Sequence, residues 1–134
     1  MSKPPSVDDV VHVAEFRAAL RRFARRSERV ARSSGLTPQR YLLLLMIKGA
    51  PNGSEQSTVT ELAERLQLAQ SSVTELVRRA QEAGLIEREQ SADDGRVAHL
   101  RLTREGELRL TRSFTDLAPE RAELRRAFAQ LDGR

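Results

Sequence analysis

TVTELAERL (residues 58–66) and QSSVTELVRRAQEAG (residues 70–84) are two short helical patterns separated by three residues. Thr58 followed by Glu61 is a capping box, in which each side chain accepts a hydrogen bond from a backbone amide at the start of a helix. Ala69 offers no such cap to the second helix, an omission that costs about 1 kcal/mol. Gly84 stands where a left-handed residue commonly ends a helix. Both patterns have one apolar side, so the stretch predicts two short helices joined by a tight turn.

A β-hairpin is predicted directly after these helices. Residues 85–90 form one short segment, Ser91 to Gly95 is rich in turn residues, and residues 96–103 alternate between apolar and other side chains. Asp94-Gly95 between two short strands is a typical hairpin signal. Before the pair of helices, Thr37-Pro38 opens another helix, whose body from Tyr41 to Ile47 is almost wholly apolar and is expected to be buried on most sides.

Further helices flank this region. From Asp8 to about Ser33 the apolar residues recur at intervals of three and four, and Gly35 ends the helix. The stripe consists of Val10, Val13, Phe16, Leu20, Phe23, Ser27 and Val30. After Thr103 a helix is predicted through Leu117, Pro119 interrupts it, and a final short helix follows. We therefore predict a mainly α fold with a small β-hairpin wing, a winged helix-turn-helix flanked by N- and C-terminal helices.

The domain organisation follows from these patterns. The 134 residues are typical of a single domain. Residues 1–7, with Lys3-Pro4-Pro5-Ser6, are expected to be disordered, and 8–33 to form the N-terminal helix. Residues 36–103 are expected to form the winged helix-turn-helix lobe, and 104–134 the C-terminal helices.

The composition narrows the classes of function. The chain has no cysteine, which excludes a disulfide framework, a thiolate metal site and thiol redox sensing. It has no apolar run of 18 residues and no signal-peptide pattern at its start, so we expect a cytoplasmic protein without a membrane partner. A net charge of +4 is compatible with binding to nucleic acid.

Enzymatic chemistry is not indicated. The sequence shows no nucleophile–base pair, no glycine-rich phosphate loop and no metal-ligand cluster, and its two histidines, His12 and His99, are far apart. We predict no catalytic residue, no metal and no cofactor.

A helix-turn-helix exposes the N-terminal half of its second helix, which can enter the major groove of duplex DNA. Small hydroxyl side chains allow a close approach and donate to phosphates, whereas Gln and Arg pair with adenine and guanine edges. Arg96, at the tip of the hairpin, can reach the adjacent minor groove. The candidate DNA-binding residues are Gln70, Ser71, Ser72, Thr74, Arg78, Asp94 and Arg96. Asp93 and Asp94 are alternatively plain turn residues, with Gly95 supplying a positive φ.

These residues resemble the MarR family of bacterial transcription regulators. The resemblance is carried by Leu62-Ala63-Glu64-Arg65-Leu66, by Ser71 to Val77, by Gly84-Leu85-Ile86, and by Asp94-Gly95-Arg96 with Leu102-Thr103-Arg104-Glu105-Gly106. Gly35 to Gln39 is also similar, so the match covers roughly 35–106. Its most specific part is Asp94-x-Arg96 followed by Leu102-Thr103-x-x-Gly106.

The resemblance implies a homodimer in which residues 8–33 form an N-terminal dimerisation helix that interlocks with shortened C-terminal dimerisation helices in residues 104–134. This dimer would bind a palindromic operator, with one helix of each protomer in a major groove and its wing in a minor groove. Arg96 would be the minor-groove residue, Asp94 would steady the wing, and Ser71, Ser72 and Thr74 would occupy contact positions. Many members release DNA when a phenolic or other small aromatic effector binds between the dimerisation region and the DNA-binding lobe. The implied function is that of a ligand-responsive repressor.

The chain departs from the family pattern at three places. Glu75 stands where the family often has a basic residue, and Gly95 stands where many members have an extra arginine. The segment from Arg104 to Pro119 is short, which predicts a smaller or differently arranged dimer.

Several alternatives remain open at this stage. Arg78 and Arg79 either face DNA, with Arg78 favoured by periodicity, or pair with Glu82. Tyr41 is either a packing residue or lies near an effector. The seven arginines of the first helix, between Arg17 and Arg32, are a solvated face or a contact for phosphates or a partner. The alternative function is a winged-helix protein-interaction module that docks through those arginines and has no sequence-specific DNA binding.

Overall fold

The computed structural model describes residues 2–133, which form six helices and one two-stranded antiparallel sheet. Met1, the first residue of the segment expected to be disordered, and Arg134 lie outside the described residues. The elements in chain order are α1 (Val7–Ser33), α2 (Pro38–Lys48), α3 (Val59–Leu66), α4 (Gln70–Glu82), β1 (Ile86–Gln90), β2 (Ala98–Leu102), α5 (Arg104–Asp116) and α6 (Ala118–Gly133). The predicted mainly α fold with a hairpin wing is confirmed.

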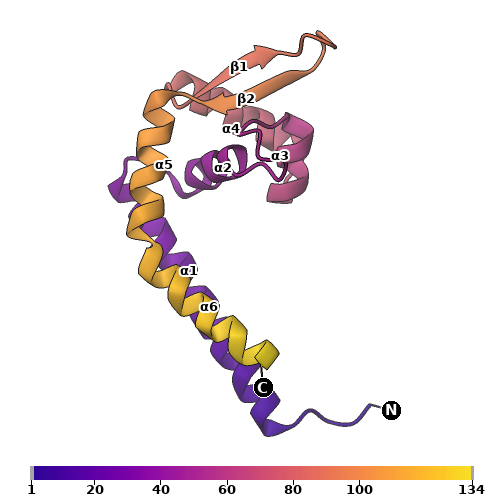
Figure 1. Cartoon of the computed structure of the whole chain (residues 1–134), viewed down its shortest axis with the longest axis vertical. Coiled ribbons are helices and arrows are strands. Elements are labelled where there is room, and N and C mark those ends of the chain that lie inside the picture. The colour runs from indigo at the N-terminus through magenta and orange to yellow at the C-terminus, as the bar shows by residue number, and fades with distance from the viewer. Residues whose placement is uncertain (1, 134) are drawn as a thin grey trace.

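The molecule has two parts, a lobe and a stem (Figure 1). Helices α2, α3 and α4 and the hairpin form the lobe at one end, and α1 and α6 run side by side away from it as the stem. Helix α5 joins the lobe to the stem, and both chain ends lie toward the far end of the stem. The lobe therefore presents its helices and its wing at the opposite end from the termini.

The core of the lobe is built around α2. Leu43, Leu44 and Ile47 are completely buried, and α3, α4 and the hairpin pack around them with Leu62, Val73, Val77, Leu85 and Leu100. Burial of each such side chain contributes about 1.5–3 kcal/mol. The expected burial of α2 is confirmed on most sides, but Leu42 remains 43% exposed.

The predicted caps and the predicted left-handed glycine at the helix ends are present in the structure. Thr58 and Glu61 make both hydrogen bonds of the capping box, at 3.2 Å and 2.8 Å. Helix α4 begins without a side-chain cap at Ala69. Gly84 has a φ of +75°, so its lack of a Cβ permits the left-handed turn into β1.

The loop of the hairpin is longer than the predicted turn segment Ser91 to Gly95. The strands pair in register from Ile86↔Leu102 to Gln90↔Ala98, so the connection spans residues 91–97 and β2 begins at Ala98, two residues later than predicted. Gly95 is not among the residues with positive φ, so the expectation that it supplies a positive φ is wrong. The loop is instead closed by backbone hydrogen bonds from Ser91 to Val97 and from Val97 to Asp94.

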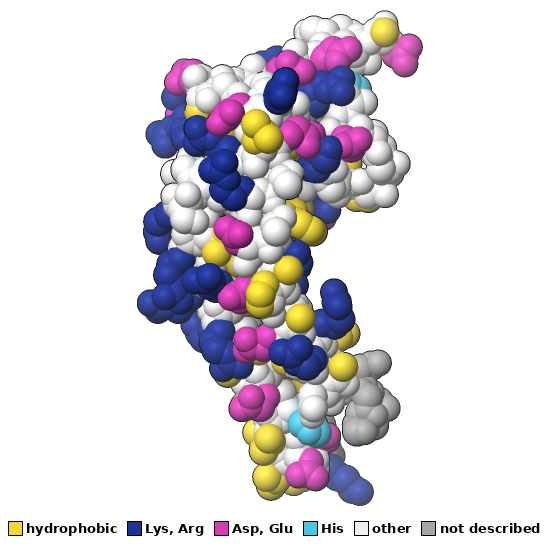
Figure 2. Space-filling model, turned by 60° about the vertical axis from the view of Figure 1, so that its left-hand side comes forward, with side chains coloured by type: hydrophobic (Ala, Val, Ile, Leu, Met, Phe, Trp, Pro, Cys, Tyr) yellow, Lys and Arg dark blue, Asp and Glu magenta, His cyan; other side chains and the backbone are white. Residues whose placement is uncertain are grey.

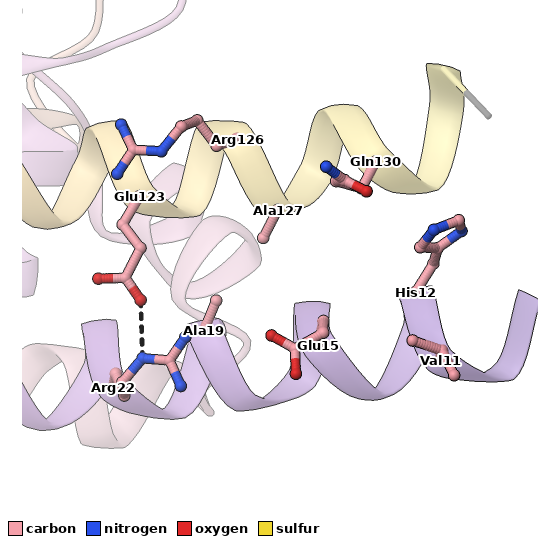
Figure 3. Close-up of a pocket in the computed structure, with 9 residues that line it drawn as sticks. All are labelled: Val11, His12, Glu15, Ala19, Arg22, Glu123, Arg126, Ala127 and Gln130. Carbon is pink, nitrogen blue, oxygen red and sulfur yellow. Dashed lines mark hydrogen bonds and ion pairs between the residues drawn. The ribbon is translucent and has the colours of Figure 1, made fainter. Parts of the chain in front are cut away.

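The stem is held by both apolar and ionic contacts. The rings of Phe16 and Phe128 meet edge to face at 5.9 Å. Arg22 and Glu123 form an ion pair at 2.7 Å across a groove between α1 and α6, as Figure 3 shows. The final helix was predicted to be short, but it has 16 residues. Pro119 lies in its first turn, where no helical hydrogen bond is lost.

The predicted apolar stripe of α1 is only partly covered. Val30 is buried and Phe16, Phe23 and Ser27 are half-buried, whereas Val10, Val13 and Leu20 are exposed. Phe114 of α5 and Phe128 of α6 also remain exposed. The stem thus keeps an uncovered apolar surface. None of the helices in the described residues is long and apolar enough to cross a membrane.

Candidate nucleic-acid interface

The N-terminal half of α4 presents polar side chains to solvent. Gln70, Ser71, Ser72 and Thr74 are all exposed. The opposite side of the helix is buried, with Val73, Val77 and Ala80 at most 3% exposed. Since residues three and four apart share one side of a helix, the buried residues fix the direction of the exposed ones. Gln70 also donates to Thr60 of α3 at 3.3 Å, which ties the two helices together.

A cluster of charges follows along the same helix. Glu75 accepts hydrogen bonds from Arg78 Nε at 3.0 Å and from Arg79 Nε at 3.0 Å. These hydrogen bonds lower the pKa of Glu75 to about 2, and the same pairing raises the pKa of Arg78 above its ordinary value. Arg78 also pairs with Glu82, which is the partner named in the alternative interpretation. Both arginines of α4 are thus already engaged by carboxylates.

Gln39 joins this surface although the sequence analysis did not single it out. It lies in the first turn of α2, beside a hollow of about 440 Å³ that it shares with Ser71, Ser72 and Glu75 of α4. No local pattern identifies Gln39, because its position depends on how α2 packs against α4. Its amide offers a donor and an acceptor next to the serines.

The wing holds its arginine in a defined place. Asp94 accepts hydrogen bonds from the backbone amide of Arg96 at 3.0 Å and from its Nε at 3.2 Å, and these contacts lower the pKa of Asp94. The Arg96 side chain is nevertheless 91% exposed. Gln90 donates to the carbonyl of Gly95 at 2.8 Å and ties the loop back to β1. The tip of the wing therefore projects the guanidinium group of Arg96 into solvent.

The Leu102-Thr103-x-x-Gly106 motif has a structural reason. Thr103 donates to the carbonyl of Gly84 at 2.6 Å and caps α5 by accepting from the amide of Gly106 at 3.1 Å. A Cβ at position 106 would lie 2.1 Å from the carbonyl oxygen of Leu85. Glycine at this position lets α5 begin directly against the base of the wing.

The charges are distributed unevenly between lobe and stem. Residues 34–103 contain eight Lys and Arg and nine Asp and Glu, a net charge of −1. Helix α1 contains seven arginines and four acidic residues, a net charge of +3. Most cations of the lobe pair with carboxylates, among them Lys48 with Glu55 and Glu107, and Arg101 with Glu87 and Glu89. The positive charge of the chain therefore resides mainly outside the lobe.

Comparison with known proteins identifies a family with this architecture. Residues 34–97 match a model of the MarR family, and a MarR family transcription regulator of known structure aligns with a TM-score of 0.69 and 26% identity over 82% of this chain and 70% of that chain. The chain is thus similar to the MarR family, with the match covering 64 of its 134 residues. This family consists of transcription regulators, in agreement with the prediction that the chain is not an enzyme.

Two DNA complexes are among the similar structures. The MosR regulator of Mycobacterium tuberculosis, solved in complex with DNA, is 27% identical with a TM-score of 0.61 over 81% of this chain and 75% of that chain. A mutant of Escherichia coli MarR in complex with operator DNA has a TM-score of 0.67 over 81% of this chain and 75% of that chain. At 19% identity this second likeness shows the fold alone. No curated protein sequence matches the chain significantly.

Proposed function

We propose that this chain is a sequence-specific DNA-binding transcription regulator of the MarR family. The observation that carries the proposal is the exposed polar half of α4 together with the 91% exposed side chain of Arg96 on the wing. An exposed helix and an adjacent basic wing are suited to a major groove and its neighbouring minor groove. The DNA complex of the MosR regulator supports this use of the same fold.

Each side chain has a defined part in this proposal. Ser71, Ser72 and Thr74 allow α4 to approach closely and donate to phosphates, and Gln70 pairs with an adenine edge. Arg96 enters the narrow minor groove, and Asp94 fixes the direction in which it projects. Arg78 contributes only to the extent that DNA displaces its carboxylate partners.

The regulator is proposed to act as a homodimer on a palindromic operator. The uncovered apolar residues of the stem, including Val13, Phe114 and Phe128, offer a surface for a second copy. A dimer would set two α4 helices on half-sites about 34–36 Å apart, one turn of duplex. Sedimentation velocity at micromolar concentration tests this assembly. A dimer is expected, and a monomer would contradict palindrome recognition.

Repression is proposed to be released by a small aromatic effector. A pocket of about 240 Å³ lies between α1 of the stem and α2 of the lobe. It is lined by Phe23, Ala24, Ser27, Glu28, Pro38, Tyr41 and Leu42. A cavity of about 150 Å³ accommodates benzene, so this pocket has room for one substituted ring. Ser27 Oγ is buried without a hydrogen-bond partner among the described residues, and burial raises the pKa of Tyr41, which keeps its hydroxyl protonated.

Binding to the DNA upstream of its own gene tests the proposed function. In a gel-shift assay the chain is expected to shift that DNA at concentrations that leave a random duplex of equal length free, and a phenol derivative is expected to reverse the shift. Equal affinity for both duplexes would contradict sequence-specific regulation. A protein with this activity would work in the cytoplasm, where bacterial operators lie.

A protein-interaction module is the second candidate. It is favoured by the net charge of −1 on the lobe and by the engagement of both α4 arginines with Glu75. Absence of any DNA binding together with a stable co-purifying partner would favour this module over the regulator.

A further inference from the structure

Five arginines of α1 form a surface that neither the fold nor the lobe uses. Each is exposed, and none forms an ion pair among the residues that the structure describes. We call them the arginine strip, and they are Arg17, Arg21, Arg25, Arg29 and Arg32. Arg22 and Arg26 are different, because both pair with carboxylates of α6. Arg22 pairs with Glu123 at 2.7 Å (Figure 3), and Arg26 pairs with Glu120 at 3.1 Å.

Helix geometry places the arginine strip on one side. At 3.6 residues per turn the five residues fall within an arc of about 120°, and they extend over about 22 Å of helix. Between Arg17 and Arg32 the same arc contains only Ala18 and Glu28 besides the arginines. The contacts of α1 with α6, made by Phe16 and Arg22 among others, lie outside that arc.

The arginine strip also carries the positive charge that the lobe lacks. Helix α1 has a net charge of +3, against −1 for the lobe. Figure 2 shows Lys and Arg side chains gathered along one edge of the stem, whereas over the lobe they alternate with Asp and Glu. An attraction for a polyanion is therefore strongest on the stem, away from α4 and the wing.

We propose that the arginine strip binds the phosphate backbone of duplex DNA without regard to sequence, as a second DNA contact besides that of the lobe. This rests on the proposed function in taking DNA as the polyanion. Duplex DNA carries one charge per about 1.7 Å, so a stretch as long as the strip presents about 13 phosphates. A protein partner would require buried anchors, usually aromatic, which the strip lacks. A membrane would require an apolar face, whereas the arc of the strip contains only Ala18 and Glu28 besides the arginines.

The salt dependence of binding to random duplex tests the proposal. The variant Arg21→Gln/Arg25→Gln removes two unpaired charges, and the control Arg22→Gln/Arg26→Gln removes two charges of the same helix that are paired with α6. Each phosphate contact contributes about 0.9 to the slope of log affinity against log salt, so the first variant is expected to lower the slope by about 1.8 per protomer. The control is expected to keep the wild-type slope. Circular dichroism and sedimentation verify that both variants keep their helices and assembly.

Three results would overturn the proposal. The first two are an unchanged slope in Arg21→Gln/Arg25→Gln and an equal loss in both variants. The third is that Arg21→Gln/Arg25→Gln loses affinity for polyglutamate, used as a probe for an acidic protein partner, but keeps wild-type affinity for random duplex. Failure of the proposed function would look different, because wild type would then not distinguish its own upstream DNA from random duplex. The comparison of the two variants on random duplex does not depend on that preference.

Discussion

The carboxylate of Glu75 accepts hydrogen bonds from the guanidinium group of Arg78 through both of its oxygens, at 3.0 Å and 2.5 Å. One of these oxygens also accepts from Arg79 at 3.0 Å. The charge on the exposed side of α4 is thus largely cancelled within the helix itself. A helix arranged in this way contacts DNA through its hydroxyl and amide side chains first, and its arginines contribute only when their carboxylate is removed.

Removal of the Glu75 charge is therefore expected to strengthen DNA binding. Glu75→Gln removes the carboxylate that pairs with Arg79 and one of the two carboxylates that pair with Arg78. Affinity for random duplex should therefore increase, and the slope of log affinity against log salt should steepen by about 0.9–1.8 per protomer. Fluorescence anisotropy on a labelled duplex at several salt concentrations measures both quantities. Glu64→Gln, which removes an exposed charge from α3, is the matched control and should have a smaller effect. Equal effects of the two variants would show that only net charge matters.

The ionisation of Glu75 gives a second prediction. Its pKa is about 2 in the folded chain against an ordinary value of 4.5. Because the folded pKa is lowered, the stabilisation from this cluster is complete above pH 4.5 and is lost as the pH falls from 4.5 through 2. Carboxyl chemical shifts measured by NMR should show Glu75 still ionised at pH 3.5. In Arg78→Gln/Arg79→Gln the midpoint should return toward 4.5, and an unshifted midpoint in that variant would contradict the assigned cause.

The junction of the stem and α5 contains a buried hydroxyl pair. Ser113 Oγ donates to Ser34 Oγ at 2.9 Å, and both residues are at most 3% exposed. Ser113→Ala is expected to lower the free energy of unfolding by about 1–3 kcal/mol, because it leaves the Ser34 hydroxyl buried without a partner. Adding Ser34→Ala should recover much of that loss. Urea unfolding at fixed protein concentration gives the free energy of unfolding of wild type, the two single variants and the double variant. Simple additivity of the two single losses would argue against the hydrogen bond between Ser113 and Ser34.

Replacement of Gly106 by a residue with a Cβ is expected to destabilise the fold for steric reasons. A Cβ there would meet the Leu85 carbonyl oxygen at 2.1 Å, and a backbone atom cannot rotate away as a side chain can. Gly106→Ala should cost about 1–3 kcal/mol, the range typical of overpacking. Gly95→Ala is the control, because its Cβ would meet nothing within 4 Å and its φ is not positive. Thermal unfolding of the two variants distinguishes them, and equal midpoints would contradict the close approach.

Much of the lobe could be predicted because its signals are local. The capping box at Thr58, the buried side of α4 and the left-handed Gly84 each depend on residues within one or two turns. The exposed residues Ser71 and Ser72 followed from the same periodicity. Periodicity together with cap and turn residues was therefore enough to predict the fold class, and periodicity predicted which side of α4 faces solvent.

Other features depend on contacts between distant segments. The role of Gly106 requires the approach of α5 to Leu85, and the place of Gln39 requires the packing of α2 against α4. The wing loop was expected to end at Gly95, but the hydrogen bond from Ser91 to Val97 closes a loop that is two residues longer. The length of α6 was underestimated because Pro119 was taken as a break and not as a first-turn residue.

Arg96 is expected to be the most sensitive single site for DNA binding. Arg96→Ala removes the exposed guanidinium of the wing and should weaken binding to the upstream DNA by about 1–3 kcal/mol if it reads a groove. Arg88→Ala removes an exposed arginine from the adjacent strand and should have a smaller effect. Asp94→Asn, which keeps Arg96 but loosens it, should fall between the two. Gel shifts of the three variants on one DNA fragment give this order directly, and a reversed order of Arg96 and Arg88 would contradict the wing contact.

The most direct measurement is a hydroxyl-radical footprint of the purified chain on the DNA upstream of its own gene. The account predicts two protected half-sites with their centres about 10–10.5 base pairs, or a multiple of that spacing, apart, since a dimer would place one α4 in each major groove. Arg96→Ala should lose protection in the minor groove beside each half-site while the major-groove pattern remains. A uniform or absent footprint at concentrations that saturate binding would contradict the claim that α4 and the wing read a specific operator.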